Sequence, residues 1–256
     1  MNKPDPNRTG GLSWTRRTRG ALTAAERRRL LGEVVRGQGR YLAGRIKLAL
    51  GRTPARAASL SAEALEPPDS KLAREAEEAC REQPPSLIGH GYRTWMFGAG
   101  LGALDGVELD PELFYVASLL HDYGIATAVA GEDFTLRSAA RLESCGNEVG
   151  AHPEAVESAA DAITVHITPG LTVERDGALG FYLQAGAMFD LAGLRAADLS
   201  PAYRDRVIAA HPRDGVTEAV VGMICAEARA NPRGRFGLLR RCGLATVVRL
   251  GPLRPW

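Results

Sequence analysis

The order of apolar and polar positions predicts a chain built from helices. From residue 69 to about residue 230, apolar residues recur at spacings of three and four, as in helices with one buried face. Glycine and proline separate these segments, and no sustained alternation of apolar and polar residues indicates a sheet. We therefore predict an all-α fold.

The segment PELFYVASLLHDYG is the most informative of these predicted helices. Asp110 is a suitable N-cap, Pro111 suits the first helical position, and Gly124 ends the segment. One apolar stripe runs along the helix, and His121 and Asp122 stand together at its C-terminal end. An isolated pair of this kind is most often a core histidine beside a solvated carboxylate. A divalent metal is the alternative that would satisfy both groups.

Two further residues favour the metal. His90 shares a helix face with Phe97 and Leu101 in SLIGHGYRTWMFG, and Asp190 stands in the apolar segment GALGFYLQAGAMFDLAGL. An acid buried alone among apolar residues is costly, whereas a metal ligand in that position is explained. Imidazole and carboxylate ligands suit Zn, Mn, Fe or Ni. The candidate ligands of one divalent metal ion are His90, His121, Asp122 and Asp190.

Charge divides the chain into a basic N-terminal segment and an acidic remainder. Residues 1–60 hold fourteen Lys and Arg against three Asp and Glu, although the whole chain carries a net charge of only +2. Residues 1–20 are expected to be disordered or to form an arm, and Thr23 and Glu26 form a capping box at the start of a helix. Contact with nucleic acid or an anionic membrane is one interpretation. We favour an Arg-rich solvated face on a helix that packs on the body or on a second subunit.

The predicted organisation is a basic segment with a proline-containing linker, residues 1–66, followed by a metal-binding helical domain, residues 67–256. No apolar run is long enough to span a membrane, and no export signal follows the Arg16-Arg17 pair. The four cysteines are scattered without a CxxC pair, as in proteins with reduced thiols. We therefore expect a cytoplasmic protein.

The ordered set HGYRTWMFG, ASLLHDYG, AITVHITPG and GAMFDLAGL resembles the HD-domain superfamily of metal-dependent phosphohydrolases, over roughly residues 68–230. That family is named for ligands in the order His, His-Asp, Asp. The flanking segments look most similar to its cyanamide-hydratase-like branch. The resemblance implies an HD-domain helical bundle, here with an extra basic N-terminal helical segment.

The resemblance also implies a hydrolase that acts on a small molecule of the phosphoester type. A single metal would lower the pKa of bound water to about 7 and supply hydroxide at neutral pH. Asp122 and His166 are the candidate catalytic residues, with His166 as the general acid/base. Arg93 and Arg137 are candidates for binding an anionic substrate, and each is equally suited to a structural ion pair.

Two positions depart from the family's pattern. Ile125 stands where some HD nucleotidases carry a glutamate, and Phe134 stands where dinuclear members carry an additional histidine. We therefore predict one metal per chain. Two alternatives stay open, a metal-dependent hydratase of a nitrile-like molecule and a non-catalytic regulatory module. A homo-oligomer is compatible with either.

Overall fold

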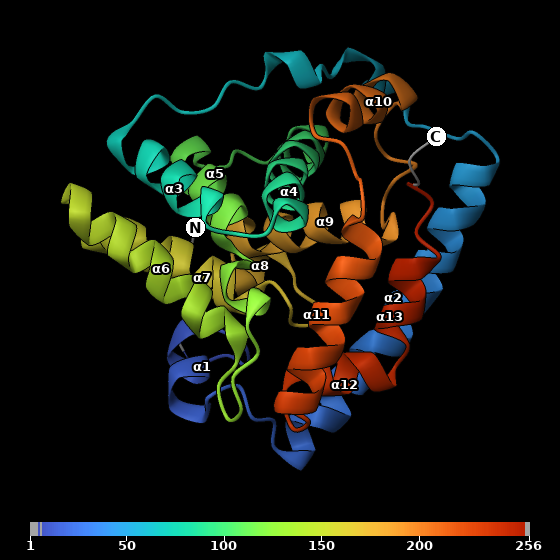
Figure 1. Cartoon of the computed structure of the whole chain (residues 1–256). Helices are drawn as coiled ribbons and strands as arrows, with labels where there is room; N and C mark the ends of the chain where they lie inside the picture. The colour runs from blue at the N-terminus through green and yellow to red at the C-terminus, as the bar shows by residue number, and fades with distance from the viewer. Residues whose placement is uncertain (1–4, 6, 254–256) are drawn as a thin grey trace.

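The computed structural model describes residue 5 and residues 7–253, and within these residues it contains α-helices and short 3-10 turns but no strand (Figure 1). The predicted all-α fold is confirmed. The elements are α1 (Leu12–Thr18), α2 (Ala24–Ala49), η1 (Ala55–Ser59), η2 (Ala62–Ala64), α3 (Lys71–Arg81), α4 (Pro85–Asp105), α5 (Pro111–Leu120), η3 (Tyr123–Ala126), α6 (Phe134–Val149), α7 (Pro153–Val165), α8 (Val173–Asp176), α9 (Ala178–Ala192), α10 (Pro201–Ala210), α11 (Val216–Ala230), α12 (Arg235–Arg241) and α13 (Leu244–Arg249).

The helix ends follow from local chemistry. The Asp110 side chain accepts a hydrogen bond from the backbone N–H of Leu113 at 2.9 Å, and Pro111 occupies the first turn of α5. Thr23 and Glu26 form the predicted capping box at the start of α2. The N-caps therefore lie where the sequence predicted them.

The centre of the molecule is the crossing of α4 and α9, which make the most extensive contact of any two elements (Figure 1). A Cβ atom on Gly186 of α9 would collide with the backbone of Thr94 and Gly98 in α4. Phe97 of α4 and Phe189 of α9 stack with their ring centroids 4.2 Å apart. Because glycine removes the side chain at the contact, the two backbones approach closely enough to bring residues of α4 and α9 into one site.

Replacing Gly186 with alanine tests this contact. Gly186→Ala should lower the free energy of unfolding by about 1–3 kcal/mol, because the added methyl group meets backbone that cannot move aside. Gly222→Ala in α11 is the control, since no atom lies within 4 Å of its Cβ position. That control should raise stability by up to about 1 kcal/mol through helix propensity. Chemical denaturation measures both values, and equal effects would contradict the packing argument.

The N-terminal segment packs on the body. Trp14, Leu22 and Leu30 form a buried cluster with Leu238 of α12. The guanidinium of Arg8 is buried and pairs with carboxylates on the body, one of them Asp176 at 3.3 Å. The expectation of disorder is therefore wrong for residues 7–20, because their aromatic and charged side chains have partners on the body. Residues 1–4 and 6 lie outside the described residues.

Arg235, fully buried in α12, joins this segment to the site-bearing helices. Its guanidinium donates to Asp133 at 2.9 Å and to the Thr164 carbonyl at 2.5 Å, and it lies over the Trp14 ring. A buried cation requires this degree of pairing. The contacts tie α12 to the N-terminus of α6 and to the last turn of α7.

A second buried group, Glu227 of α11, holds the start of α6. Its carboxylate accepts hydrogen bonds from the backbone N–H of Phe134 at 3.3 Å and from the Asn231 side chain at 2.8 Å. Burial raises the pKa of Glu227 from an ordinary value of 4.5 to about 7. The folded state therefore holds the proton more tightly than the unfolded state.

This pKa shift predicts a pH dependence of stability. The contribution of Glu227 is fully present below about pH 4.5 and is lost as the pH rises through about 7. In Glu227→Gln the free energy of unfolding should fall less over this pH range, by about 1–3 kcal/mol. Urea titrations at several pH values measure it, with Glu157→Gln on the exposed side of α7 as control. An unchanged profile in Glu227→Gln would show that the carboxyl titrates normally.

None of the helices in the described residues combines the length and the apolar character needed to cross a membrane.

Candidate metal centre

Four helices supply the candidate site. His90 lies in α4, His121 caps the C-terminus of α5 and is followed by Asp122, and His166 caps the C-terminus of α7. Asp190 lies in the last turn of α9. All five side chains are buried. The structure therefore brings together residues that are separated by up to 100 positions in the sequence.

His90, His121 and Asp122 form the tightest group. Their ligand atoms all lie within 4.8 Å of one another. The two Nε2 atoms of His90 and His121 are 3.3 Å apart, and each lies 3.6–3.7 Å from Oδ2 of Asp122. His166 stands beside them, with its Nε2 atom 3.6 Å from Oδ1 of Asp122.

The second nitrogen of each imidazole has a fixed partner that can only accept a hydrogen bond. Nδ1 of His121 lies 2.8 Å from the Ser118 carbonyl, and Nδ1 of His166 lies 2.6 Å from the Ile163 carbonyl. Nδ1 of His90 lies 2.7 Å from the Asp190 carboxylate. Each Nδ1 therefore carries the proton, and in the neutral imidazole each Nε2 is left as an unprotonated acceptor.

This arrangement fits a divalent cation. When both protons lie on Nδ1, two Nε2 lone pairs face one another across 3.3 Å, and a cation between them removes their repulsion. Burial lowers the pKa of His121 to about 3, so its ring is neutral, as a ligand must be. Although burial opposes ionisation of Asp122, the adjacent histidines, His121 foremost, hold the pKa of Asp122 well below its usual range. The cluster thus offers imidazole nitrogen atoms and one carboxylate, a donor set that suits a transition metal.

Asp190, the fourth predicted ligand, lies next to this group and contacts it through His90. Its carboxylate lies against Nδ1 of His90, on the side of the ring away from the Nε2 group, and it is absent from the three-residue cluster. It accepts hydrogen bonds from Arg93 at 2.9 Å and from Arg213. Despite burial, these two arginines hold the pKa of Asp190 well below its usual range. Asp190 thus orients His90 through a hydrogen bond.

Both arginines suggested for substrate binding are engaged within the protein. Arg93 is almost completely buried and, besides Asp190, donates to the carbonyls of His211 at 3.1 Å and Pro212 at 2.8 Å. Arg137 donates to two backbone carbonyls, both at 2.8 Å, in the segment that follows Asp122. In this structure both arginines therefore make the structural contacts that were the alternative to substrate binding.

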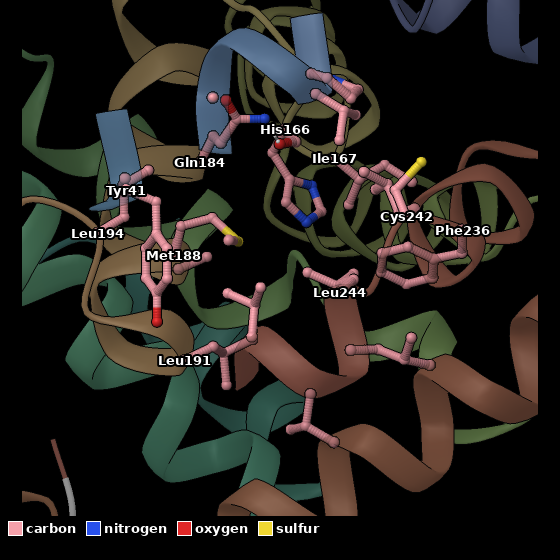
Figure 2. Close-up of a pocket in the computed structure, with 18 of the residues that line it drawn as sticks. Tyr41, His166, Ile167, Gln184, Met188, Leu191, Leu194, Phe236, Cys242 and Leu244 are labelled. Carbon is pink, nitrogen blue, oxygen red and sulfur yellow. Dashed lines mark hydrogen bonds between the residues drawn. The ribbon is translucent and has the colours of Figure 1, made fainter. Parts of the chain in front are cut away.

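A cavity of about 220 Å³ opens from the histidine cluster. Figure 2 shows His166 pointing into it, with Tyr41 and Met188 on one side and Phe236 and Leu244 on the other. Lysine and arginine are absent from the described residues that line it. Its polar lining consists of the three histidines, Asp122, Gln184 and three residues of α2, namely Glu33, Gln38 and Tyr41.

The two positions that depart from the family's pattern also lie here. Ile125 lines the cavity, and the Phe134 ring is packed at 6.2 Å from the His166 ring, measured between centroids. Neither side chain can ligate a metal. Both place apolar groups beside the candidate site, and the number of metals stays a prediction.

Sequence reasoning missed two contributions to this site. Arg213, in the segment AAHPRDG, is almost completely buried beside Asp190. The cavity-lining residues of α2 were assigned to the basic segment and not to the site. Neither contribution has a local signal, because each depends on how distant parts of the chain pack.

In comparisons with known proteins, no family model matches this chain, and no curated protein matches it. Membership of the HD-domain superfamily therefore stays a prediction that rests on the motifs.

The position of Asp190 generates a prediction about metal affinity. Asp190→Asn should weaken Zn²⁺ binding about 10- to 100-fold, as expected when a residue that orients a ligand is lost. Asp122→Asn removes a group of the cluster itself and should weaken binding further. Competition with a chromophoric chelator measures both affinities, and circular dichroism verifies the fold of each variant. If folded Asp190→Asn lost Zn²⁺ as completely as Asp122→Asn, Asp190 would be a direct ligand.

Proposed function

We propose that this chain is a metal-dependent hydrolase or hydratase of the HD-domain type, which adds water to a small molecule. The observation that carries the proposal is the convergence of the Nε2 atoms of His90 and His121 with the Asp122 carboxylate at the end of a cavity. A divalent Zn, Mn, Fe or Ni ion held there would lower the pKa of a bound water to about 7.

Asp122 and His166 are the groups placed to move protons. Their nearest side-chain atoms are 3.6 Å apart, and both residues line the cavity. The Ile163 carbonyl holds the proton of His166 on Nδ1, so Nε2 is free to accept a proton from the substrate side. Gln184 donates to the His166 carbonyl and further fixes the loop that carries it.

The cavity lining favours an uncharged reacting group. A phosphoester carries negative charge, and enzymes commonly stabilise it with arginine or lysine. The described lining offers neither residue, and Arg93 and Arg137 are committed to other partners. Hydration of a nitrile-like group or hydrolysis of a neutral ester or amide therefore fits better than the phosphoester chemistry implied by the resemblance, which is the second candidate. The non-catalytic alternative leaves the converging histidines without a role.

A cytoplasmic location belongs to the same proposal. Cys80, Cys145, Cys225 and Cys242 are free thiols, as expected in a reducing compartment.

Turnover with metal-loaded protein tests the proposal. The chain should bind one equivalent of metal by elemental analysis and convert cyanamide or an alkyl nitrile faster than bis(4-nitrophenyl) phosphate. His166→Gln should retain the metal and lower kcat about 10²- to 10⁴-fold. His211→Gln is the control, because His211 stacks on Tyr92 and does not line the cavity. Two tightly bound equivalents, or full activity in His166→Gln, would contradict the proposed site.

A further inference from the structure

The basic N-terminal helix forms one wall of the cavity. Five residues of α2 line it, although they precede His90 by about 50 positions or more. These residues are Glu33, Val34, Gly37, Gln38 and Tyr41. Figure 2 shows Tyr41 beside Met188 of α9. The segment that appeared to be an appendage in the sequence is therefore part of the candidate site.

Three other helices contribute apolar side chains to the same cavity. Met188 and Leu191 come from α9, Val220 and Ile224 from α11, and Phe236 from α12. Apolar surface of this extent gains free energy when it is covered by an apolar group. The cavity thus has a polar end at the histidines and a largely apolar remainder, to which α2 adds the polar side chains of Glu33, Gln38 and Tyr41.

The one charged side chain of α2 in the described lining is Glu33. Its carboxylate pairs with Arg36, which is largely exposed and does not line the cavity. An anionic substituent that entered this part of the cavity would meet Glu33 and would find no cation in the described lining. The apolar part of the cavity is therefore suited to an uncharged group.

We infer that the substrate is an uncharged molecule with an apolar substituent, whose reacting group lies at His90, His121 and Asp122 while the substituent lies against α2. This inference rests on the proposed function and adds the class of substrate to it. Because Gly37 lines the cavity without a side chain, a larger residue there should reduce the space for the substituent.

Gly37 is the position where this can be tested most directly. It lies inside α2, where glycine has a poor helix propensity, and no atom lies within 4 Å of its Cβ position. A larger residue at position 37 would therefore extend into free space at the cavity wall without displacing backbone. Gly39 lies in the same helix, and no atom lies within 4 Å of its Cβ position either, but Gly39 does not line the cavity.

Binding of alkyl nitriles to the full-length protein as purified tests the inference. Affinity should rise from acetonitrile to butanenitrile to hexanenitrile by up to about fourfold per methylene group. Gly37→Leu should weaken hexanenitrile binding at least tenfold and leave acetonitrile unchanged. Gly39→Leu should bind both as the parent does. Ligand-observed NMR titration gives the dissociation constants, and thermal melts show that both variants fold.

A charged analogue separates an apolar preference from simple size. 5-Cyanopentanoate, with a carboxylate at the end of the chain, should bind at least tenfold more weakly than hexanenitrile. Equal binding of these two compounds, no dependence on chain length, or equal effects of Gly37→Leu and Gly39→Leu would overturn the inference. Conversion of the nitriles by the metal-loaded protein is measured in a separate experiment. Chain-length-dependent binding without conversion under any metal would defeat the proposed reaction and leave the substrate-binding wall in place.

Discussion

The buried carboxylate of Asp190 is the constraint on which the candidate site depends. Removing a carboxylate from water is costly, and it persists here because Arg93, Arg213 and His90 all contact it. The same contacts connect α4, α9 and the segment before α11, and they orient the His90 ring toward His121. Close packing of α4 and α9 through Gly186 makes the contacts geometrically available. The charge cluster and the helix crossing are therefore two aspects of one arrangement.

Helix C-termini place the other two histidines. The last carbonyls of a helix have no partner within it, and they accept hydrogen bonds from groups just beyond the helix end. His121 and His166 each contact the carbonyl three residues earlier, Ser118 and Ile163 respectively. This local interaction satisfies a helix end and holds the Nε2 atom toward Asp122. It also places two helix C-termini, which favour positive charge, beside the candidate metal centre.

The elements and the central cluster could be predicted because their signals are local. Apolar spacing, N-caps and an acid or histidine on an apolar helix face all reflect interactions within about one turn. The contact of Asp190 with His90 could not be predicted in this way, because a buried acid has the same sequence pattern whether it contacts a metal or another side chain. Arg93 and Arg137 show the same limit, since their partners are backbone carbonyls and a carboxylate from distant segments. The ordering of residues 7–20 depends likewise on partners such as Asp161 and Leu238.

Different charged groups lie on the two sides of the His90 ring, and this arrangement links the fold to the proposed chemistry. Behind the ring, Arg93 and Arg213 both pair with Asp190, and neither arginine lines the cavity. In front of it, the described lining offers imidazoles, the carboxylates of Asp122 and Glu33, three uncharged polar side chains and many apolar ones. The cation that we propose at this cluster would supply, beside Asp122, a positive charge that no lysine or arginine of the described lining provides. That charge would lie at the reacting end, whereas the cavity lining from α11, α12 and α13 is almost entirely apolar.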